Sequence, residues 1–126
     1  CTLEKSATHL LDFISEDNFI VNYTVIPYTG VSMIDFRFRV KETRTKEQVE
    51  ELIENSISEG ALKGLYGMCE VDTGPEIHNC TPFSSVIVKE NVAVKQDSIY
   101  LPAYFDNENS VNRYFDLVDY VCQESY

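Results

Sequence analysis

The sequence is short of basic residues. Ten Lys and Arg stand against 21 Asp and Glu, which gives a formal net charge of -11. Such a charge repels phosphate backbones and anionic lipid surfaces, so we expect no nucleic-acid partner. No apolar run approaches the roughly 18 residues of a membrane-spanning helix, so we expect no direct membrane insertion by this segment. The charge favours solubility, a protein partner with a basic surface, or a cation.

Metal ligands are also scarce. The chain has only two histidines, His9 and His78, and none of its four cysteines belongs to a Cys-x-x-Cys pair. A zinc site therefore lacks its ordinary ligands and spacing. The acidic run 106–109 supplies oxygen atoms, but its spacing is not that of an EF-hand loop, so we interpret it as a turn before the last helix. We predict no metal and no cofactor.

The glycine signatures of hydrolases are missing as well. The five glycines form no Gly-x-Ser-x-Gly elbow and no run that would make an oxyanion hole. His78 is close in sequence to Ser84 and Ser85, as a serine hydrolase would need. Beside a cysteine loop, however, His78 is more simply an exposed surface residue. We therefore predict that the chain is not an enzyme.

Residues 31–61 carry the clearest local pattern, a strand that leads into an amphipathic helix. Apolar and charged residues alternate over 34–40, which predicts a strand with one face in water. Thr45 and Gln48 have capping-box spacing at the start of the helix, and Gly60 would provide a left-handed stop. The helix stripe consists of Val49, Leu52, Ile53 and Ile57.

The other periodicities predict two more helices and several strands. The predicted helices cover 3–14 and 110–121, and the predicted strands cover 19–26, 65–71, 85–94 and 99–101. No repeat or linker interrupts the chain, so residues 1–126 should form a single domain. The order of elements predicts an α+β, ferredoxin-like sandwich, in which helices pack on one face of an antiparallel sheet.

Cysteines and glycosylation sequons suggest the compartment. We predict two disulfides, Cys69 with Cys80 and Cys1 with Cys122, which would staple the sandwich; four reduced cysteines of a cytosolic protein are the alternative. Asn-x-Thr sequons also favour the secretory pathway. The sequons begin at Asn22 and Asn79. We therefore expect an extracellular or cell-surface glycoprotein.

The segment Phe83-Ser84-Ser85-Val86-Ile87-Val88 resembles the SEA domain, an extracellular module of mucins, matrix proteoglycans and adhesion receptors. In that family a Gly-Ser-Val-Val-Val type motif starts a strand after a loop. Many members cleave themselves at the Gly-Ser bond. The resemblance implies Ser85 as the nucleophile, but Ser84 replaces the glycine and raises the cost of the strained conformation that cleavage needs. We predict that the bond between Ser84 and Ser85 stays intact.

Two surfaces are candidates for protein binding. The central helix has an acidic face, which is ordinarily just a solvated surface. Tyrosines near the C-terminal end either form a contact surface or reach the rim of the core. The two sets are Glu47, Glu50, Glu51 and Glu54, and Tyr100, Tyr104, Tyr114 and Tyr120.

We therefore expect a non-enzymatic module of a larger cell-surface or adhesion-receptor protein. It would serve adhesion, spacing or receptor architecture through protein–protein contacts. The alternative is a secreted or pathogen surface protein that engages a host receptor.

Overall fold

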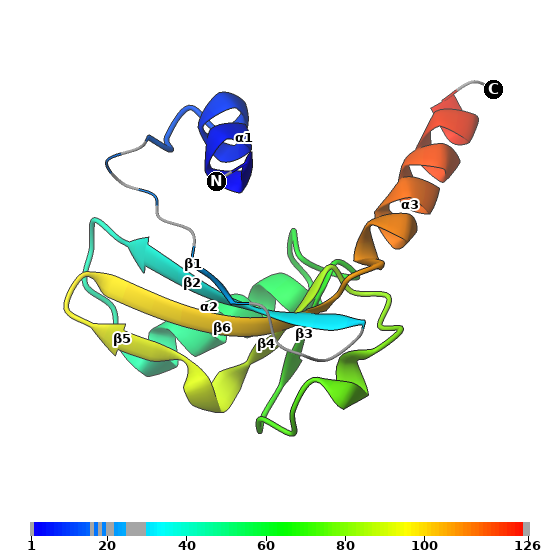
Figure 1. Cartoon of the computed structure of the whole chain (residues 1–126). Helices are drawn as coiled ribbons and strands as arrows, with labels where there is room; N and C mark the ends of the chain where they lie inside the picture. Colours follow the sequence, from blue (N-terminus) through cyan, green and yellow to red (C-terminus); the bar gives the residue numbers. More distant parts are fainter. Residues whose placement is uncertain (1, 16, 18, 20–21, 25–29, 125–126) are drawn as a thin grey trace.

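The computed structural model describes the chain except for residues 1, 16, 18, 20–21, 25–29 and 125–126. In the described part a mixed sheet forms the body of the molecule (Figure 1). The elements are α1 (Thr2–Leu10), β1 (Asn22–Thr24), β2 (Val31–Arg39), α2 (Lys46–Ser58), β3 (Tyr66–Cys69), η1 (Glu76–His78), β4 (Ser85–Val88), η2 (Lys89–Asn91), β5 (Ala93–Lys95), β6 (Ser98–Asp106) and α3 (Asn109–Glu124).

The sheet has the strand order β1-β2-β6-β4-β3, and β5 pairs with β6 beside β4. β2 and β6 are antiparallel along their full length, from Val31 opposite Asp106 to Arg39 opposite Ser98. β3 and β4 are parallel. The predicted α+β class is therefore confirmed, whereas the prediction of a purely antiparallel sheet is wrong.

The capping box at the start of α2 is present as predicted. The Gln48 amide donates to Thr45 Oγ1 at 3.3 Å, and the Thr45 amide donates to Gln48 Oε1 at 3.0 Å. These two bonds satisfy amides that a helix N-terminus otherwise leaves without partners. The prediction that Gly60 ends α2 in a left-handed conformation is wrong. Glycine is needed there for space, because a Cβ atom would lie 2.8 Å from the Cα of Ser56.

The main core lies between α2 and one face of the sheet. It consists of Val49, Ile53, Ile87, Val92, Ile99 and Ala103. A smaller cluster of Val31, Val88 and Tyr104 lies on the opposite face. The two clusters occupy opposite faces because successive side chains of a strand alternate, as at Ile87 and Val88.

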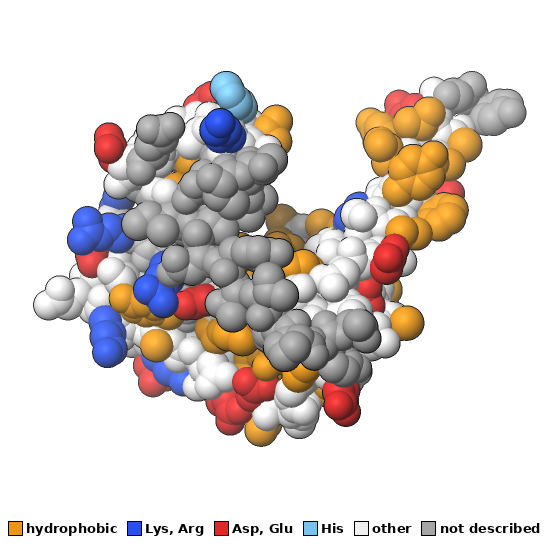
Figure 2. Space-filling view, viewed as in Figure 1, with side chains coloured by type: hydrophobic (Ala, Val, Ile, Leu, Met, Phe, Trp, Pro, Cys, Tyr) orange, Lys and Arg blue, Asp and Glu red, His pale blue; other side chains and the backbone are white. Residues whose placement is uncertain are grey.

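The predicted packing of helices on one face is correct for α2 only. α3 has no buried residue, and Figure 1 shows it projecting away from the sheet. The hydrophobic atoms along this helix are visible in the space-filling view (Figure 2). Its exposed large apolar residues are Val111, Tyr114, Phe115, Leu117, Val118, Tyr120 and Val121. No helix of the described residues is both long and apolar enough to cross a bilayer.

Two predicted strands have different limits in the structure. The run 85–94 is not one strand, because the 3-10 turn η2 separates β4 from β5. β6 continues through Pro102, where the sequence predicts an interruption. Pro102 is tolerated because neither β4 nor β5 pairs with it. The ladder between β4 and β6 involves Ala103 and Tyr104, and the ladder between β5 and β6 ends at Tyr100.

The predicted disulfide between Cys69 and Cys80 is not formed, since both are free thiols in the structure. Cys69 lies on β3, and its Sγ donates to the Ile87 carbonyl oxygen at 3.7 Å. Cys80 is exposed and is held elsewhere by its amide, which donates to Asp106. Cys122 is also free and exposed. Its predicted partner, Cys1, lies outside the described residues.

Candidate functional site

Asp106 connects three segments at the point where β6 ends and α3 begins, which we call the β6–α3 junction. Its side chain is only 4% exposed. One carboxylate oxygen accepts from the Cys80 amide at 2.6 Å, and the other accepts from the Glu108 amide at 2.7 Å. Its backbone carbonyl accepts from Asn109 Nδ2 at 2.7 Å. The predicted turn at 106–109 is thus confirmed as the start of α3, and Asp106 fastens it to the loop between β3 and β4.

The N-terminal end of β2 reaches the same junction. The Asn107 amide donates to the Gly30 carbonyl oxygen at 2.7 Å, and Ser32 Oγ donates to Asn107 Oδ1 at 2.6 Å. Gly30 has a φ of +105°, and a Cβ atom there would lie 3.0 Å from Asn79 Oδ1. Only glycine combines this backbone conformation with that close approach.

Arg113 makes the further contacts between α3 and the loop. Its Nη1 donates to Ser84 Oγ at 3.1 Å, and its Nη2 donates to the Pro82 carbonyl oxygen at 3.3 Å. Nε lies 2.8 Å from the Asp116 carboxylate, one turn further along the helix. The first two turns of α3 are therefore held to the loop, while the rest of the helix extends into solvent.

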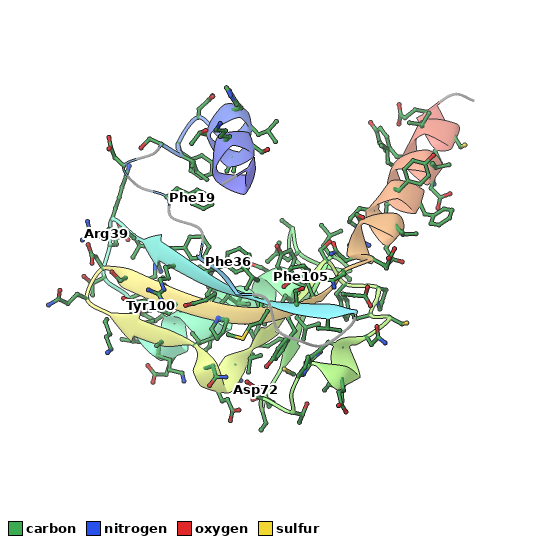
Figure 3. All side chains as sticks on the ribbon, viewed as in Figure 1. Phe19, Phe36, Arg39, Asp72, Tyr100 and Phe105 are labelled. Atoms are coloured by element: carbon green, nitrogen blue, oxygen red, sulfur yellow. The ribbon has the colours of Figure 1, made fainter. Side chains whose placement is uncertain are left out.

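A second cluster lies on the same loop and the face of β6. The His78 ring stacks on Tyr104, with centroids 5.0 Å apart and planes 16° apart. The Tyr104 hydroxyl donates to Asp72 Oδ1 at 3.1 Å. Asp72, labelled in Figure 3, also accepts from the Gly74 amide at 3.0 Å and from Asn91 Nδ2 at 3.1 Å. One carboxylate thus holds three separate parts of the chain.

The environment of this cluster favours uncharged rings. Burial lowers the pKa of His78, and the nearby Asp72 carboxylate only partly offsets this effect. Burial, followed by the hydrogen bond to Asp72, raises the pKa of Tyr104. His78 is 5% exposed, so its prediction as a surface residue is wrong. The imidazole is buried because η1 folds back onto β6.

The two serines of the predicted cleavage site hold the loop in place. Ser85 is buried, and its Oγ donates to the Tyr104 carbonyl oxygen at 3.1 Å. Ser84 Oγ accepts from Arg113. These contacts do not prepare either hydroxyl for attack, since a nucleophile must give its proton to a base. That the bond between Ser84 and Ser85 stays intact remains a prediction.

The remaining sulfur and acidic groups offer no reactive centre in the described residues. Burial, with the nearby Asp72 carboxylate, raises the pKa of the Cys69 thiol, which keeps it protonated and poorly nucleophilic. No group of three His, Cys, Asp or Glu side chains in the described residues is placed to hold a metal ion.

The predicted acidic face of α2 is partly neutralised. Glu50 lies 3.5 Å from Lys46, and Glu54 lies 2.6 Å from Lys89. Hydrogen bonds with its own backbone and with Thr45 lower the pKa of Glu47. Glu51 borders a shallow surface hollow of about 360 Å³ on the outer side of the helix. The hollow is also lined by Arg44, Gln48, Leu52, Asn55 and Ser56. Binding of a basic protein at this face stays a prediction.

The predicted tyrosine surface does not form as one patch. Tyr104 is 6% exposed and therefore belongs to the core. Tyr100 is half-buried, and the Arg37 guanidinium lies 5.5 Å from its ring centroid. Tyr114 and Tyr120 are exposed on α3. The sequon residue Asn79 is also exposed, whereas the side chain of Asn22 lies outside the described residues.

No family model matches the chain. Curated proteins similar to it are glyceraldehyde-3-phosphate dehydrogenases. The one from Monascus purpureus is 30% identical over 96 residues, which are 75% of this chain and 28% of that protein. The cytosolic one from Dianthus caryophyllus is 32% identical over 103 residues, 78% of this chain and 30% of that protein. The one from Buchnera aphidicola is 28% identical over 99 residues, 77% of this chain and 30% of that protein. The chain spans less than a third of the length of these relatives.

These similarities correct the functional predictions. Likeness to dehydrogenases contradicts both a non-enzymatic adhesion module and a secreted receptor-binding protein. It also contradicts the prediction that the chain is not an enzyme. The extracellular or cell-surface location is contradicted too, because two of the relatives are named as cytosolic enzymes. The resemblance to SEA domains gains no support, since no family model matches.

Composition, periodicity and the functional motifs considered in the sequence did not reveal this similarity. The alternative of four reduced, buried cysteines agrees with the structure in part: the three described cysteines are free thiols, but Cys80 and Cys122 are exposed. The sequence predicts a turn at Asp106, which agrees with its bond to the nearby Glu108 amide, but the Cys80 amide that it also holds lies 26 residues earlier. Such contacts leave no local pattern to find.

Proposed function

We propose that this chain is part of a dehydrogenase that oxidises a phosphorylated aldehyde. The observation that carries the proposal is sequence similarity. Curated glyceraldehyde-3-phosphate dehydrogenases from fungi, plants and a bacterium match 66–79% of the chain at 28–32% identity. A similarity shared by such different organisms favours common descent over chance.

The chain supplies a scaffold in this proposal rather than the complete reaction centre. Hydride transfer from an aldehyde ordinarily requires a nicotinamide cofactor. The five glycines form no Gly-x-Gly-x-x-Gly fingerprint, and the connection from β2 to α2, residues 40–45, contains no glycine. The residues of this chain therefore do not fit that cofactor, and we derive no step through it. The contribution of the chain is a sheet that holds the β6–α3 junction in a fixed geometry.

The exposed apolar surface of α3 supports the proposal that this chain is part of a larger folded protein. Its apolar residues are exposed along one broad side of the helix. Large exposed apolar patches ordinarily mark contacts with further protein. The relatives that this chain matches are more than three times as long as the matched region. We propose that α3 packs against the part of the dehydrogenase that corresponds to the rest of those relatives.

The test is an activity assay on the protein that carries this chain, isolated from its native source. We expect it to oxidise glyceraldehyde-3-phosphate and to reduce a nicotinamide cofactor, followed by absorbance. Asp106→Ala should abolish the activity because it releases the β6–α3 junction. The matched control is Asp97→Ala, since the Asp97 side chain is 52% exposed. Absence of turnover with glyceraldehyde-3-phosphate and with shorter phosphorylated aldehydes would refute the proposed function.

A further inference from the structure

His78 is a buried titratable side chain that the proposed function does not use. It is 5% exposed, and its Nε2 has no hydrogen-bond partner in the described part of the chain. The ring is held by stacking on Tyr104. A neutral imidazole tolerates this environment, whereas an imidazolium buried without a partner is strongly disfavoured.

The groups around His78 are already engaged. From β6, Tyr104 donates its hydroxyl to Asp72, and Asp106 accepts two backbone amides. From the loop, Asp72 accepts three donors and is the acidic group that acts on the pKa of His78. On the same turn, Glu76 is exposed. The neighbours of His78 therefore stabilise its protonated ring only slightly. Protonation becomes favourable when the ring reaches water.

The loop that carries His78 is held to the rest of the chain near its two ends, through Asp72 on one side and through Cys80 and Pro82 on the other. Its residue Cys80 has a φ of +60°, which is strained for a side chain other than glycine. The Cys80 amide is held by Asp106 of β6, and the Asp72 amide is held by Glu90 of η2. Movement of the loop away from β6 would relieve the strain at Cys80 and expose His78, at the cost of these contacts.

We propose that the loop 72–82 is a pH-sensitive latch on the β6–α3 junction, closed while His78 is neutral and opened when His78 takes up a proton. Opening removes the Cys80 amide from Asp106 and thereby breaks one of the two amide contacts of the Asp106 carboxylate at the β6–α3 junction. This latch is independent of the proposed dehydrogenase function.

The sign of the pH dependence follows from the depressed pKa of His78, whose ordinary value is 6.5. Above that value His78 is neutral in both the closed and the open loop, so pH has no effect. As the pH falls below 6.5, His78 binds a proton in the open loop but not in the closed loop. The equilibrium constant for opening then rises by up to about tenfold per pH unit, and levels off below the pKa of the closed loop.

The test is hydrogen exchange of the Asp72 and Cys80 amides, which both donate to residues outside the loop. It is measured in the whole chain between about pH 5 and pH 8 and corrected for intrinsic exchange rates. Protection of both amides should fall below pH 6.5, while that of the Val49 amide in α2 should not. His78→Phe keeps an aromatic ring on Tyr104 but cannot titrate, so the loop should lose its pH dependence. His9→Phe is the matched control, because the other histidine is exposed on α1.

A second readout covers the case in which His78→Phe does not fold. In the wild-type chain, the NMR signals of the His78 ring should titrate together with those of the Asp72 and Cys80 amides. An unchanged pH dependence in folded His78→Phe would overturn the proposal. So would loop protection that does not vary with pH, or ring signals that titrate without any change in the two amides.

Discussion

Replacement of Asp106 by Ala should destabilise the fold more than any change of a single surface charge. The substitution removes two short hydrogen bonds from a buried carboxylate, at 2.6 and 2.7 Å, and leaves the Cys80 and Glu108 amides without that acceptor. Hydrogen bonds to charged groups contribute about 1.5–3 kcal/mol each, so we expect the two bonds together to cost about 3–6 kcal/mol. Domains are stable by only about 5–15 kcal/mol in total, so this loss takes a large share.

Urea unfolding followed by circular dichroism measures this change. The midpoint should fall with an unchanged slope, and the melting temperature should drop by about 10–15 °C. Asp97→Ala is the control. Asp97 forms an ion pair with Arg39 at 3.8 Å on the surface, and loss of this pair should lower the free energy of unfolding by less than about 1 kcal/mol. If the free energy of unfolding of Asp106→Ala lay within about 1 kcal/mol of the wild-type value, the structural role assigned to this carboxylate would be wrong.

Three further predictions concern α2 and the cysteines. Thr45→Ala removes the N-cap acceptor and should lower the free energy of unfolding by about 1 kcal/mol in urea titrations; a change near zero would contradict the capping role. Ile53→Ala should cost about 2–5 kcal/mol because the side chain is buried, whereas Leu52→Ala, on the exposed side of the same helix, should cost far less. Equal losses in these two variants would contradict the packing of α2. Mass spectrometry after brief treatment with a thiol reagent should find Cys80 labelled well before Cys69, since Cys80 is exposed and the pKa of the Cys69 thiol is raised. Preferential labelling of Cys69 would refute this order.

The sequence predicts best where local chemistry decides the structure. The β2 strand and the Thr45–Gln48 capping box are each encoded within a few residues, and both are present in the structure. Such signals need no knowledge of distant contacts. The predicted alternation of burial along β2 is not found, since Phe38 is exposed, as are its charged neighbours Arg37 and Arg39. The continuation of β6 through Pro102 could not be predicted, because it depends on where β4 and β5 end along the neighbouring edge.

The candidate site is harder to predict because its contacts span the chain. His78 has no local feature that distinguishes a buried from an exposed ring, and its burial results from stacking on Tyr104, 26 residues away. Asp106 likewise accepts from Cys80, 26 residues earlier. For α3, the amphipathic pattern predicts the helix but not which surface covers it. The sequence therefore indicates the elements, while tertiary contacts decide the site.

The position of β6 in the sheet has a consequence for biosynthesis. This strand lies between β2 on one side and β4 with β5 on the other, yet it is the last strand to be made. The ribosome must add some 60 residues after β2 before β6 begins, which takes roughly 3–12 s at typical elongation rates. During that interval the nascent chain presents an unpaired β2 edge with Ile34 and Phe36 beside it. Chaperones that shield extended apolar segments should therefore engage this polypeptide during translation and release it once Ser98–Asp106 has emerged.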